Sequence, residues 1–429
     1  MKTREIKPGV KVKLHTRQGD FECVILESPS KEVVLVKLNS GYNIGLMEED
    51  ILDLKVIHEK KIVDEIKSKV EVKKDLPNIA LVVTGGTISS RLDSKTGAVK
   101  WLTESDELLK FYPEILEIAN IAKIEVPFMK ASEDMDCKDW TVIAETVANL
   151  LNDSKIEGVI VTHGTDFLHY TAVALSFALE NLNKPVVLTY SQRSSDRASS
   201  DARLNLQCAA RVAVSDIAEV MLVGHGTIDD NFCLALPGTK VRKMHTSRRD
   251  TFRPINSRAI AKVFQDKIEP FEKYNVRDNK KRVELKNKFS DKVALVKFYP
   301  GMKSEIFDYF LNEKYKGLVV ELSGLGHLST KDSRNDLIAK IKKLVSKGVI
   351  VCGVAQTIYG KVDPLVYSNG RELEKTGMLF LGDMLSETAL VKLSWVLGDS
   401  NLRKNSKENM LRNFTGEFSD FISEDEFLN

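Results

Sequence analysis

Two short segments rich in threonine and glycine carry side chains that could act as nucleophiles. They read Thr84-Gly85-Gly86-Thr87 and Thr162-His163-Gly164-Thr165-Asp166, and each follows a run of apolar residues. Glycine lets the backbone approach a substrate closely, and a threonine hydroxyl can attack a carbonyl carbon when a nearby base takes its proton. Covalent hydrolysis of an acyl compound is therefore one interpretation of this pair.

Two other interpretations of these segments are open. Each could be a strand-to-helix turn that needs glycine for a positive φ angle, with Thr165 and Asp166 capping the helix that follows. A phosphate cradle would need the glycine spacing of a dinucleotide-binding motif or a P-loop, and neither segment has that spacing. The segments taken singly do not decide between catalysis and a structural turn.

The segments lie where parallel strands are predicted to end. Apolar runs typical of strands buried on both faces of a sheet occur at 79–83, 158–161, 186–189 and 220–223. Residues 138–151 have apolar side chains at helical spacing, and a further helix is predicted over 200–213. Alternating strands and helices predict a parallel sheet, and ligands bind beyond the carboxyl ends of such strands.

Pattern and composition divide the chain into six parts. Short alternating strands near the N-terminus predict a small barrel, and highly charged stretches with few apolar residues predict linkers. The strand and helix pattern restarts late in the chain, which predicts a second, smaller α/β domain. The predicted parts are an SH3-like β-barrel at 1–60, a charged linker at 61–78, a larger α/β domain at 79–264, an interdomain linker at 265–291, a smaller α/β domain at 292–398 and a C-terminal tail at 399–429.

Composition narrows the classes of protein to which the chain can belong. It has 429 residues with 63 Lys and Arg and 61 Asp and Glu, and its net charge of +2 does not support a nucleic-acid binder that acts alone. The five cysteines are odd in number and include no C-x-x-C pair, so we expect neither a disulfide framework nor a zinc site. No apolar stretch is typical of a signal peptide or a membrane span, and we expect a cytoplasmic protein.

The two threonine-rich segments together resemble the bacterial-type L-asparaginase family. That family has a T-G-G-T-I segment followed by a T-H-G-T-D segment, and this chain has Thr84-Gly85-Gly86-Thr87-Ile88 and Thr162-His163-Gly164-Thr165-Asp166 in the same order. The resemblance covers residues 79–398. It implies an α/β fold with an L-asparaginase-like, two-domain parallel-sheet body, to which this chain adds the N-terminal barrel. It also implies release of ammonia from a side-chain carboxamide.

The resemblance implies four catalytic residues. Thr87 matches the nucleophile of the family, although Thr165 stays open as the first attacking group. Thr165 and Asp166 match the second threonine and its carboxylate. Lys243 aligns best with the catalytic lysine, with Lys240 as the alternative, and these groups would take the proton of the attacking hydroxyl. Because Lys243 lies in a basic stretch, an ordinary surface lysine is the competing interpretation.

Further positions would bind the substrate. Ser132 matches the residue that binds the substrate α-carboxylate in the family, and Glu133 would be a further contact. Backbone groups at Gly86 and Gly164 would also face the substrate. A plain loop serine stays open for Ser132, and we interpret His163 as a structural, hydrogen-bonded imidazole. No metal ligand is expected in this chain.

Three features distinguish the chain from a free-standing asparaginase. They are the N-terminal barrel with its linker, the segment 192–202 and the basic stretch 240–258. All three are similar to the D-subunit family of the archaeal glutamyl-tRNA(Gln) amidotransferase. One departure is Ala198, where that family leads us to expect proline.

This second resemblance implies a division of labour between two subunits. The chain would hydrolyse glutamine or asparagine, and ammonia would pass through a tunnel to an E subunit. That E subunit would bind tRNA(Gln) and use ATP and Mg²⁺ to activate the mischarged glutamate. The chain itself would bind no cofactor. It would form a homodimer with an E subunit on each side, giving an α2β2 heterotetramer.

Two other functions compete with this one. A free-standing cytoplasmic L-asparaginase or glutaminase would hydrolyse free amides well without a partner. A non-catalytic scaffold or small-molecule-binding protein would keep the fold, and its negligible glutamine hydrolysis would not change in a Thr87→Ala variant. Activity measured with and without a partner therefore separates the three.

Overall fold

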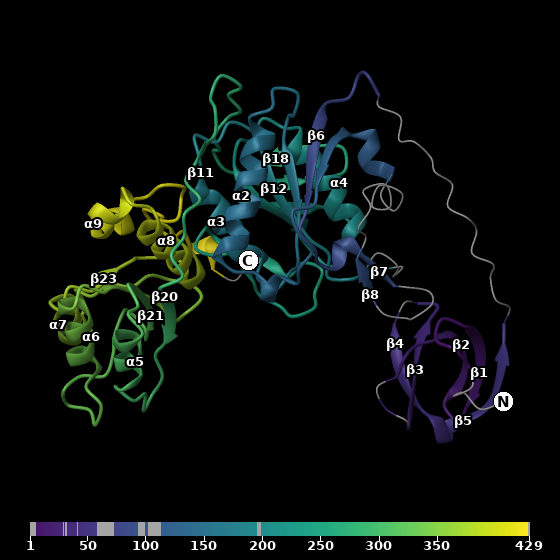
Figure 1. Cartoon of the computed structure of the whole chain (residues 1–429), viewed down its shortest axis with the longest axis horizontal. Helices are drawn as coiled ribbons and strands as arrows, with labels where there is room; N and C mark the ends of the chain where they lie inside the picture. Colours follow the sequence, from purple (N-terminus) through teal and green to yellow (C-terminus); the bar gives the residue numbers. More distant parts are fainter. Residues whose placement is uncertain are drawn as a thin grey trace.

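The computed structural model shows an N-terminal β-domain followed by a larger α/β body (Figure 1). The residues that the structure describes are 6–28, 30, 32–40, 42–57, 73–92, 99–101, 113–194 and 199–427. The predicted charged linker at 61–78 therefore lies mostly outside the described residues.

The N-terminal domain is an antiparallel sheet that curls around a small apolar core (Figure 1). Side chains alternate along its first strand, so that Val12 and Leu14 are buried while Lys13 is exposed. Its strands lie in the order β4-β3-β2-β1-β5. They are β1 (Lys11–Thr16), β2 (Gly19–Ile25), β3 (Val33–Leu38), β4 (Asn43–Met47) and β5 (Ile51–Val56). This is the small β-barrel that the sequence predicts.

The larger α/β domain is built on an eight-stranded sheet in the order β18-β17-β14-β13-β12-β10-β6-β9. Five neighbouring strands run parallel, and they are β9 (Asn120–Glu125), β6 (Asn78–Val83), β10 (Val159–Thr162), β12 (Val186–Thr189) and β13 (Val220–His225). Three antiparallel strands extend the sheet, and they are β14 (Cys233–Pro237), β17 (Ala261–Val263) and β18 (Ile268–Pro270). The carboxyl ends of β6, β10 and β12 therefore meet at one edge.

Helices cover both faces of this sheet. Leu81 packs in the core under α4 (Ala202–Ala213), and its neighbour Val82 packs in the opposite core, under α2 (Cys137–Leu151) and α3 (Leu168–Ala178). This alternation is the period-two pattern of a strand, with both of its faces buried. The continuous apolar runs seen in the sequence have this cause.

The smaller C-terminal domain is a four-stranded parallel sheet with helices on both faces. Its strands are β20 (Val293–Lys297), β21 (Gly317–Leu322), β22 (Ile350–Ala355) and β23 (Leu379–Phe380). Its helices are α5 (Ile306–Asn312), α6 (Leu337–Ser346), α7 (Ser368–Glu374), α8 (Ser386–Gly398) and α9 (Ser406–Leu411). Helix α8 packs against α3, so it joins the core of this domain to the larger one.

Three two-stranded pairs complete the described strands. They are β7 (Ser90–Leu92) with β8 (Val99–Trp101), β11 (Leu179–Glu180) with β19 (Glu284–Leu285), and β15 (Val241–Lys243) with β16 (Phe252–Pro254). The first strand of the β15–β16 hairpin ends at Lys243, which is predicted from the sequence to be catalytic.

Two segments pack more closely than their composition predicts. The stretch 265–291, predicted to be a linker, adds β18 to the edge of the large sheet and buries Val283. The C-terminal tail, predicted to begin at residue 399, buries Met410 and Glu417 completely. Strand β18 joins the sheet through backbone hydrogen bonds, and the buried Glu417 forms an ion pair with Lys392. Neither therefore leaves an apolar run in the sequence.

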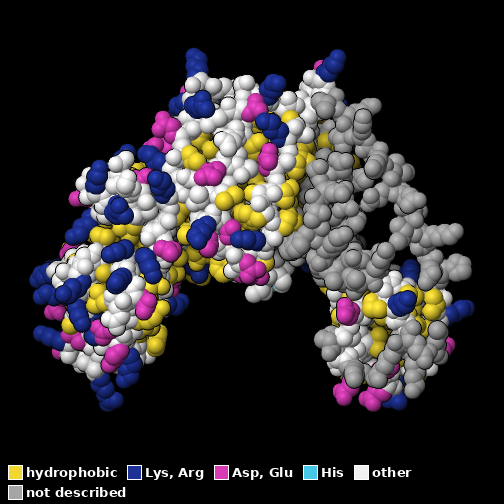
Figure 2. Space-filling model, viewed as in Figure 1, with side chains coloured by type: hydrophobic (Ala, Val, Ile, Leu, Met, Phe, Trp, Pro, Cys, Tyr) yellow, Lys and Arg dark blue, Asp and Glu magenta, His cyan; other side chains and the backbone are white. Residues whose placement is uncertain are grey.

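Charges of both signs are spread over the surface. On the face drawn in Figure 2, Lys and Arg side chains alternate with Asp and Glu and are densest over the C-terminal domain. Among the described residues, no helix combines the length and the apolar character needed to cross a membrane.

Candidate active site

The two threonine-rich segments meet at the carboxyl ends of β6 and β10. These strands are parallel neighbours, with Val83 beside Thr162. Thr84 continues the pairing, since its backbone N–H donates to the Thr162 carbonyl at 3.2 Å and its hydroxyl donates to the same oxygen at 2.9 Å. The sheet therefore brings together two segments that are far apart in the sequence.

Glycines let these segments touch backbone to backbone. Gly86 has a φ of +85°, and a Cβ at this position would lie 2.5 Å from the Gly164 nitrogen. A Cβ on Gly164 would lie 3.0 Å from the Ser132 side chain. A side chain at either glycine would push the neighbouring segment away. The glycines predicted to face the substrate therefore also fix the spacing of three loops.

Lys243 reaches this place from the end of β15. Its Nζ donates to Thr165 Oγ1 at 2.9 Å and to Asp166 Oδ1 at 2.6 Å. The lysine side chain is 11% exposed and the Asp166 side chain is 60% exposed, so the cluster is open to water on the carboxylate side. The structure thus brings together three of the four residues predicted to be catalytic, with their side chains in direct contact.

The fourth residue, Thr87, flanks the same backbone contact. It begins a 3₁₀ turn over Thr87–Ser89, directly after Gly86, and it is half-buried. Since Gly86 packs on Gly164, Thr87 and Thr165 follow the two touching glycines.

Ser132 and Glu133 lie beside these glycines. Ser132 is buried, its Oγ accepts the Phe167 N–H at 3.4 Å, and its hydroxyl lies 3.3 Å from Glu133 Oε2. The predicted substrate-binding pair therefore adjoins the predicted catalytic residues.

Three known protein families together match most of this chain. A GatD N-terminal domain family matches residues 6–57, an asparaginase N-terminal family matches 78–275, and a glutaminase/asparaginase C-terminal family matches 292–410. The D subunit of the glutamyl-tRNA(Gln) amidotransferase of Pyrococcus furiosus is 48% identical over 415 residues, which are 95% of this chain and 93% of that protein. The chain belongs to the GatD family.

Other GatD proteins and solved asparaginases agree with this family. The amidotransferase D subunit of Thermococcus kodakarensis is 47% identical over 98% of this chain and 96% of that protein. The L-asparaginase structure from the same organism has a TM-score of 0.70 at 26% identity, covering 80% of this chain and 99% of that one. L-asparaginase I from Vibrio cholerae has a TM-score of 0.69 at 27% identity, with the same coverage. The predicted L-asparaginase-like, two-domain body is therefore confirmed.

Lys240, the alternative to Lys243 in the sequence, lies elsewhere in this GatD family member. It is buried and forms an ion pair with Asp383 of the C-terminal domain. Burial lowers the pKa of Lys240, although the carboxylate of Asp383 opposes this shift. The structure therefore favours Lys243, because the Lys240 side chain joins the two domains while Lys243 contacts Thr165.

His163 is a structural residue, as the sequence predicts. It is fully buried, its Nδ1 lies 2.8 Å from the Gly164 carbonyl oxygen, and its Nε2 lies 2.9 Å from the Thr171 hydroxyl. A carbonyl oxygen only accepts, so Nδ1 carries the hydrogen and Nε2 accepts from Thr171. Burial lowers the pKa of His163 to about 4, which keeps the imidazole neutral near pH 7.

Arg242, which precedes Lys243 on β15, forms a polar cluster with Glu387 and His169 that was not predicted from the sequence. Arg242 Nε lies 3.3 Å from Glu387 Oε1, and His169 Nε2 lies 3.9 Å from the same oxygen. The sequence contained one indication of this cluster, because Glu387 is an acidic residue near the start of a mostly apolar helix. Its partners could not be read from the sequence, since they lie on two distant elements.

The structure offers no metal centre among the residues it describes. Across these residues, no group of three or more His, Cys, Asp or Glu side chains is placed to hold a metal ion.

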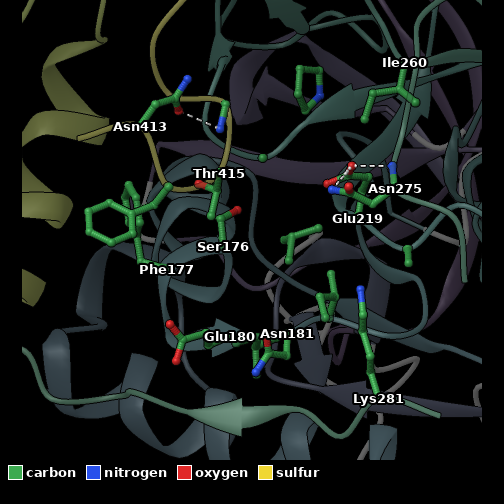
Figure 3. A pocket seen from close by; sticks show the side chains of 18 of the residues that line it. Ser176, Phe177, Glu180, Asn181, Glu219, Ile260, Asn275, Lys281, Asn413 and Thr415 are labelled. Atoms are coloured by element: carbon green, nitrogen blue, oxygen red, sulfur yellow. Dashed lines mark hydrogen bonds between the residues drawn. The ribbon is translucent and has the colours of Figure 1, made fainter. Parts of the chain in front are cut away.

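A large hollow lies at the other edge of the sheet. It has a volume of about 600 Å³, and Figure 3 shows Ser176, Glu219 and Thr415 among its lining residues. Glu219 accepts hydrogen bonds from the backbone and side chain of Asn275, at 2.9 and 2.8 Å. The hollow adjoins Val220, where β13 begins, whereas the threonine segments follow strand ends. It is therefore separate from the candidate active site.

Proposed function

We propose that this chain is the ammonia-releasing subunit of a tRNA-dependent amidotransferase. It hydrolyses the side-chain amide of glutamine, or of asparagine, and the ammonia converts Glu-tRNA(Gln) to Gln-tRNA(Gln) on a partner subunit. The observation that carries this proposal is the contact of Lys243 with Thr165 and Asp166 beside the touching glycines. Membership of the GatD family supports the same role.

In the proposed reaction, the Thr87 hydroxyl attacks the carboxamide carbon and forms an ester. The proton of the hydroxyl passes to Lys243, which must be in its neutral form to accept it, and Asp166 then stabilises the ammonium that results. The C–N bond breaks, and the leaving nitrogen takes up a proton and departs as ammonia. Water then hydrolyses the threonine ester and restores the enzyme. The direct contact of Lys243 with Thr165 leaves the reverse order of the two threonines as the alternative.

The glycine-rich segments supply backbone donors for the intermediate. The negative oxygen formed by the attack needs preorganised N–H groups, and each donor is commonly worth about 10²–10³ in rate. We assign this role to backbone N–H groups beside Gly86 and Gly164, since those residues form the contact between the two segments.

The substrate's own charged groups would bind next to this site. We assign its α-carboxylate to the Ser132 hydroxyl and its α-ammonium to the Glu133 carboxylate. The two side chains lie close together, and Ser132 lies beside Gly164, which suits an amino acid substrate.

The remaining steps belong to a partner in this proposal. We assign tRNA(Gln), ATP and Mg²⁺ to an E subunit, and we propose a homodimer of this chain with one E subunit on each side. The mixed charge in Figure 2 and the net charge of +2 favour tRNA binding mainly by the partner. The proposal places the chain in the cytoplasm, where charged tRNA is used.

The test is ammonia release from glutamine and from asparagine, by the chain alone and with the partner subunit and tRNA(Gln). We expect low basal hydrolysis that the partner raises strongly, and loss of this activity in Thr87→Ala. Full activity on free asparagine, unchanged by the partner, would indicate a free-standing asparaginase instead. Equal, negligible rates for wild type and Thr87→Ala in the complete complex would indicate a scaffold.

A further inference from the structure

Glu387 is a buried acidic residue at the contact between the two α/β domains. It lies in the first turn of α8, its residue is 6% exposed, and α8 packs against α3 of the larger domain. Its Oε1 atom lies 3.3 Å from Arg242 Nε and 3.9 Å from His169 Nε2. One carboxylate of the C-terminal domain thus contacts two elements of the larger domain.

One of these elements carries Lys243, and the other begins just after Thr165 and Asp166. Arg242 directly precedes Lys243 on β15, so the two side chains point to opposite sides of the strand. His169 lies in the first turn of α3, which begins at Leu168, shortly after Asp166 in the chain. Glu387 therefore bridges the strand that presents Lys243 and the helix that follows Thr165 and Asp166.

The Glu387 and His169 side chains of this cluster are poorly solvated, with 7% of each exposed. Among the described atoms, Glu387 Oε2 and His169 Nδ1 are buried without a hydrogen-bond partner. Burial raises the pKa of Glu387, although Arg242 opposes the shift and Glu321 adds to it. Burial and the nearby Arg242 and Lys243 lower the pKa of His169 to about 3, so this imidazole is neutral near pH 7.

This environment makes the carboxylate costly for stability. Removing one member of an ion pair is strongly destabilising where the remaining charge is buried, but the Arg242 side chain is 32% exposed, so water can solvate it when Glu387 is neutral. A group whose pKa is higher in the folded chain adds stability at low pH and loses it as the pH rises through the folded value. Burial therefore disfavours the charged carboxylate of Glu387 relative to a neutral amide, and a contribution to the geometry of the site would explain why it is there.

We propose that Glu387 is a positioning residue for the reaction. Through Arg242 it holds β15 against α3, and it thereby keeps Lys243 within hydrogen-bonding distance of Thr165 and Asp166. This inference rests on the proposed function, because it concerns the same lysine. It also means that catalysis depends on how the C-terminal domain packs on the larger domain, because Glu387 lies on α8, which packs against α3.

The test is a double-mutant cycle on amide hydrolysis with Glu387→Gln, Arg242→Gln and the double variant, assayed in the complete complex. We expect each single variant to lower kcat about tenfold with KM within twofold, because a misplaced base costs rate rather than substrate binding. The double variant should lose no more than the worse single variant, since both changes break one contact. Thermal unfolding of Glu387→Gln should occur at the same temperature or a higher one.

A control on the same helix is Ser394→Ala, which removes a hydrogen bond from α8 to the Ser290 carbonyl far from Lys243. It should keep wild-type kcat. A wild-type kcat in Glu387→Gln, or losses that multiply in the double variant, would overturn the inference. If Glu387→Gln does not fold, Arg242→Gln decides, because normal activity there also overturns it. Inactive wild type and Ser394→Ala would instead count against the proposed function itself.

Discussion

Lys243 and Lys240 lie on the same short stretch of chain and have different neighbours. Lys243 contacts Thr165 and Asp166 near the surface, and Lys240 contacts Asp383 in the interior. The sequence could predict a lysine from this stretch and could favour one of the two. The structure separates the two, because it places the Lys243 side chain at Thr165 and the Lys240 side chain at Asp383.

At the residue scale, Lys243→Met should lower kcat by about 10³, because a positioned base contributes about 10²–10⁴ in rate. Thermal stability should change little, since the lysine is not part of the core. Lys240→Met provides the contrast, because it leaves the Asp383 carboxylate buried without its cation and should lower the unfolding temperature. Steady-state ammonia release and thermal unfolding of both variants make the comparison. A kcat close to wild type in Lys243→Met would exclude it as the base.

Because His163 is buried and neutral, we expect the folded chain to lose stability in mild acid. Its pKa is about 4 in the folded chain and about 6.5 when unfolded. Between these values the unfolded chain binds the proton and the folded chain does not, so the free energy of unfolding decreases as the pH falls. The decrease has an upper bound of about 3 kcal/mol.

The control for this effect is His163→Asn, which cannot titrate but keeps an N–H donor for the Gly164 carbonyl. Urea unfolding of both proteins between pH 7 and about pH 4.5 should give a shallower pH dependence for the variant. Parallel curves would show that another group causes the acid sensitivity.

At the scale of elements, the site depends on the contact between the turns after β6 and β10. The sequence predicted both turns, because glycine and threonine follow buried apolar runs. It could not predict how closely they approach, since a distance of this kind is set by the strand pairing of β6 with β10. The Glu387 contact was hidden for the same reason, because α8 and β15 meet only in the folded molecule.

Gly86→Ala tests the contact between these turns. The new methyl group would lie 2.5 Å from the Gly164 nitrogen and would have to push the second turn away. We expect kcat/KM to fall at least about 100-fold, as misplacement by about 1 Å can cost this much.

The matched control is Gly301→Ala, at a glycine with a similar φ of +81° but with no atom within 4 Å of the added methyl. Both variants carry the strain of alanine at positive φ, about 1 kcal/mol or more. Only Gly86→Ala carries the clash. Similar activity in the two variants would mean that the close approach is unimportant for catalysis.

At the scale of the whole molecule, the C-terminal segment is tied to α8 by a buried ion pair. The side chains of Lys392 and Glu417 are 0% exposed, and Lys392 Nζ lies 2.7 Å from Glu417 Oε1. Lys392 also donates to the Met410 carbonyl, and Glu417 accepts the backbone N–H groups of Phe414 and Thr415. The tail is thus part of the folded body.

Glu417→Gln should destabilise the chain by about 3 kcal/mol, because removing one member of a buried pair leaves the other charge uncompensated. Glu269→Gln is the control, since its pair with Lys267 is about half exposed and surface pairs contribute little to stability. Chemical unfolding of both variants makes the comparison. Equal effects would show that the tail is not held by this pair.

The sequence predicted the two-domain body and the added barrel, because each has its own repeating pattern. It did not predict how the two α/β domains and the C-terminal tail are joined. The contacts of Lys240 with Asp383, Arg242 with Glu387 and Lys392 with Glu417 each pair charged residues that composition assigns to the surface. Their burial is a property of the assembled fold.

In the proposed mechanism, Thr87 forms an ester with the substrate while Lys243 handles the proton. The most direct measurement is mass-spectrometric mapping of the complex after treatment with a diazoketone analogue of glutamine, which alkylates an active nucleophile. We predict an adduct on Thr87 that forms slowly in Lys243→Met and is absent in Thr87→Ala. An adduct on Thr165, or on neither threonine of a complex that hydrolyses glutamine, would contradict this mechanism.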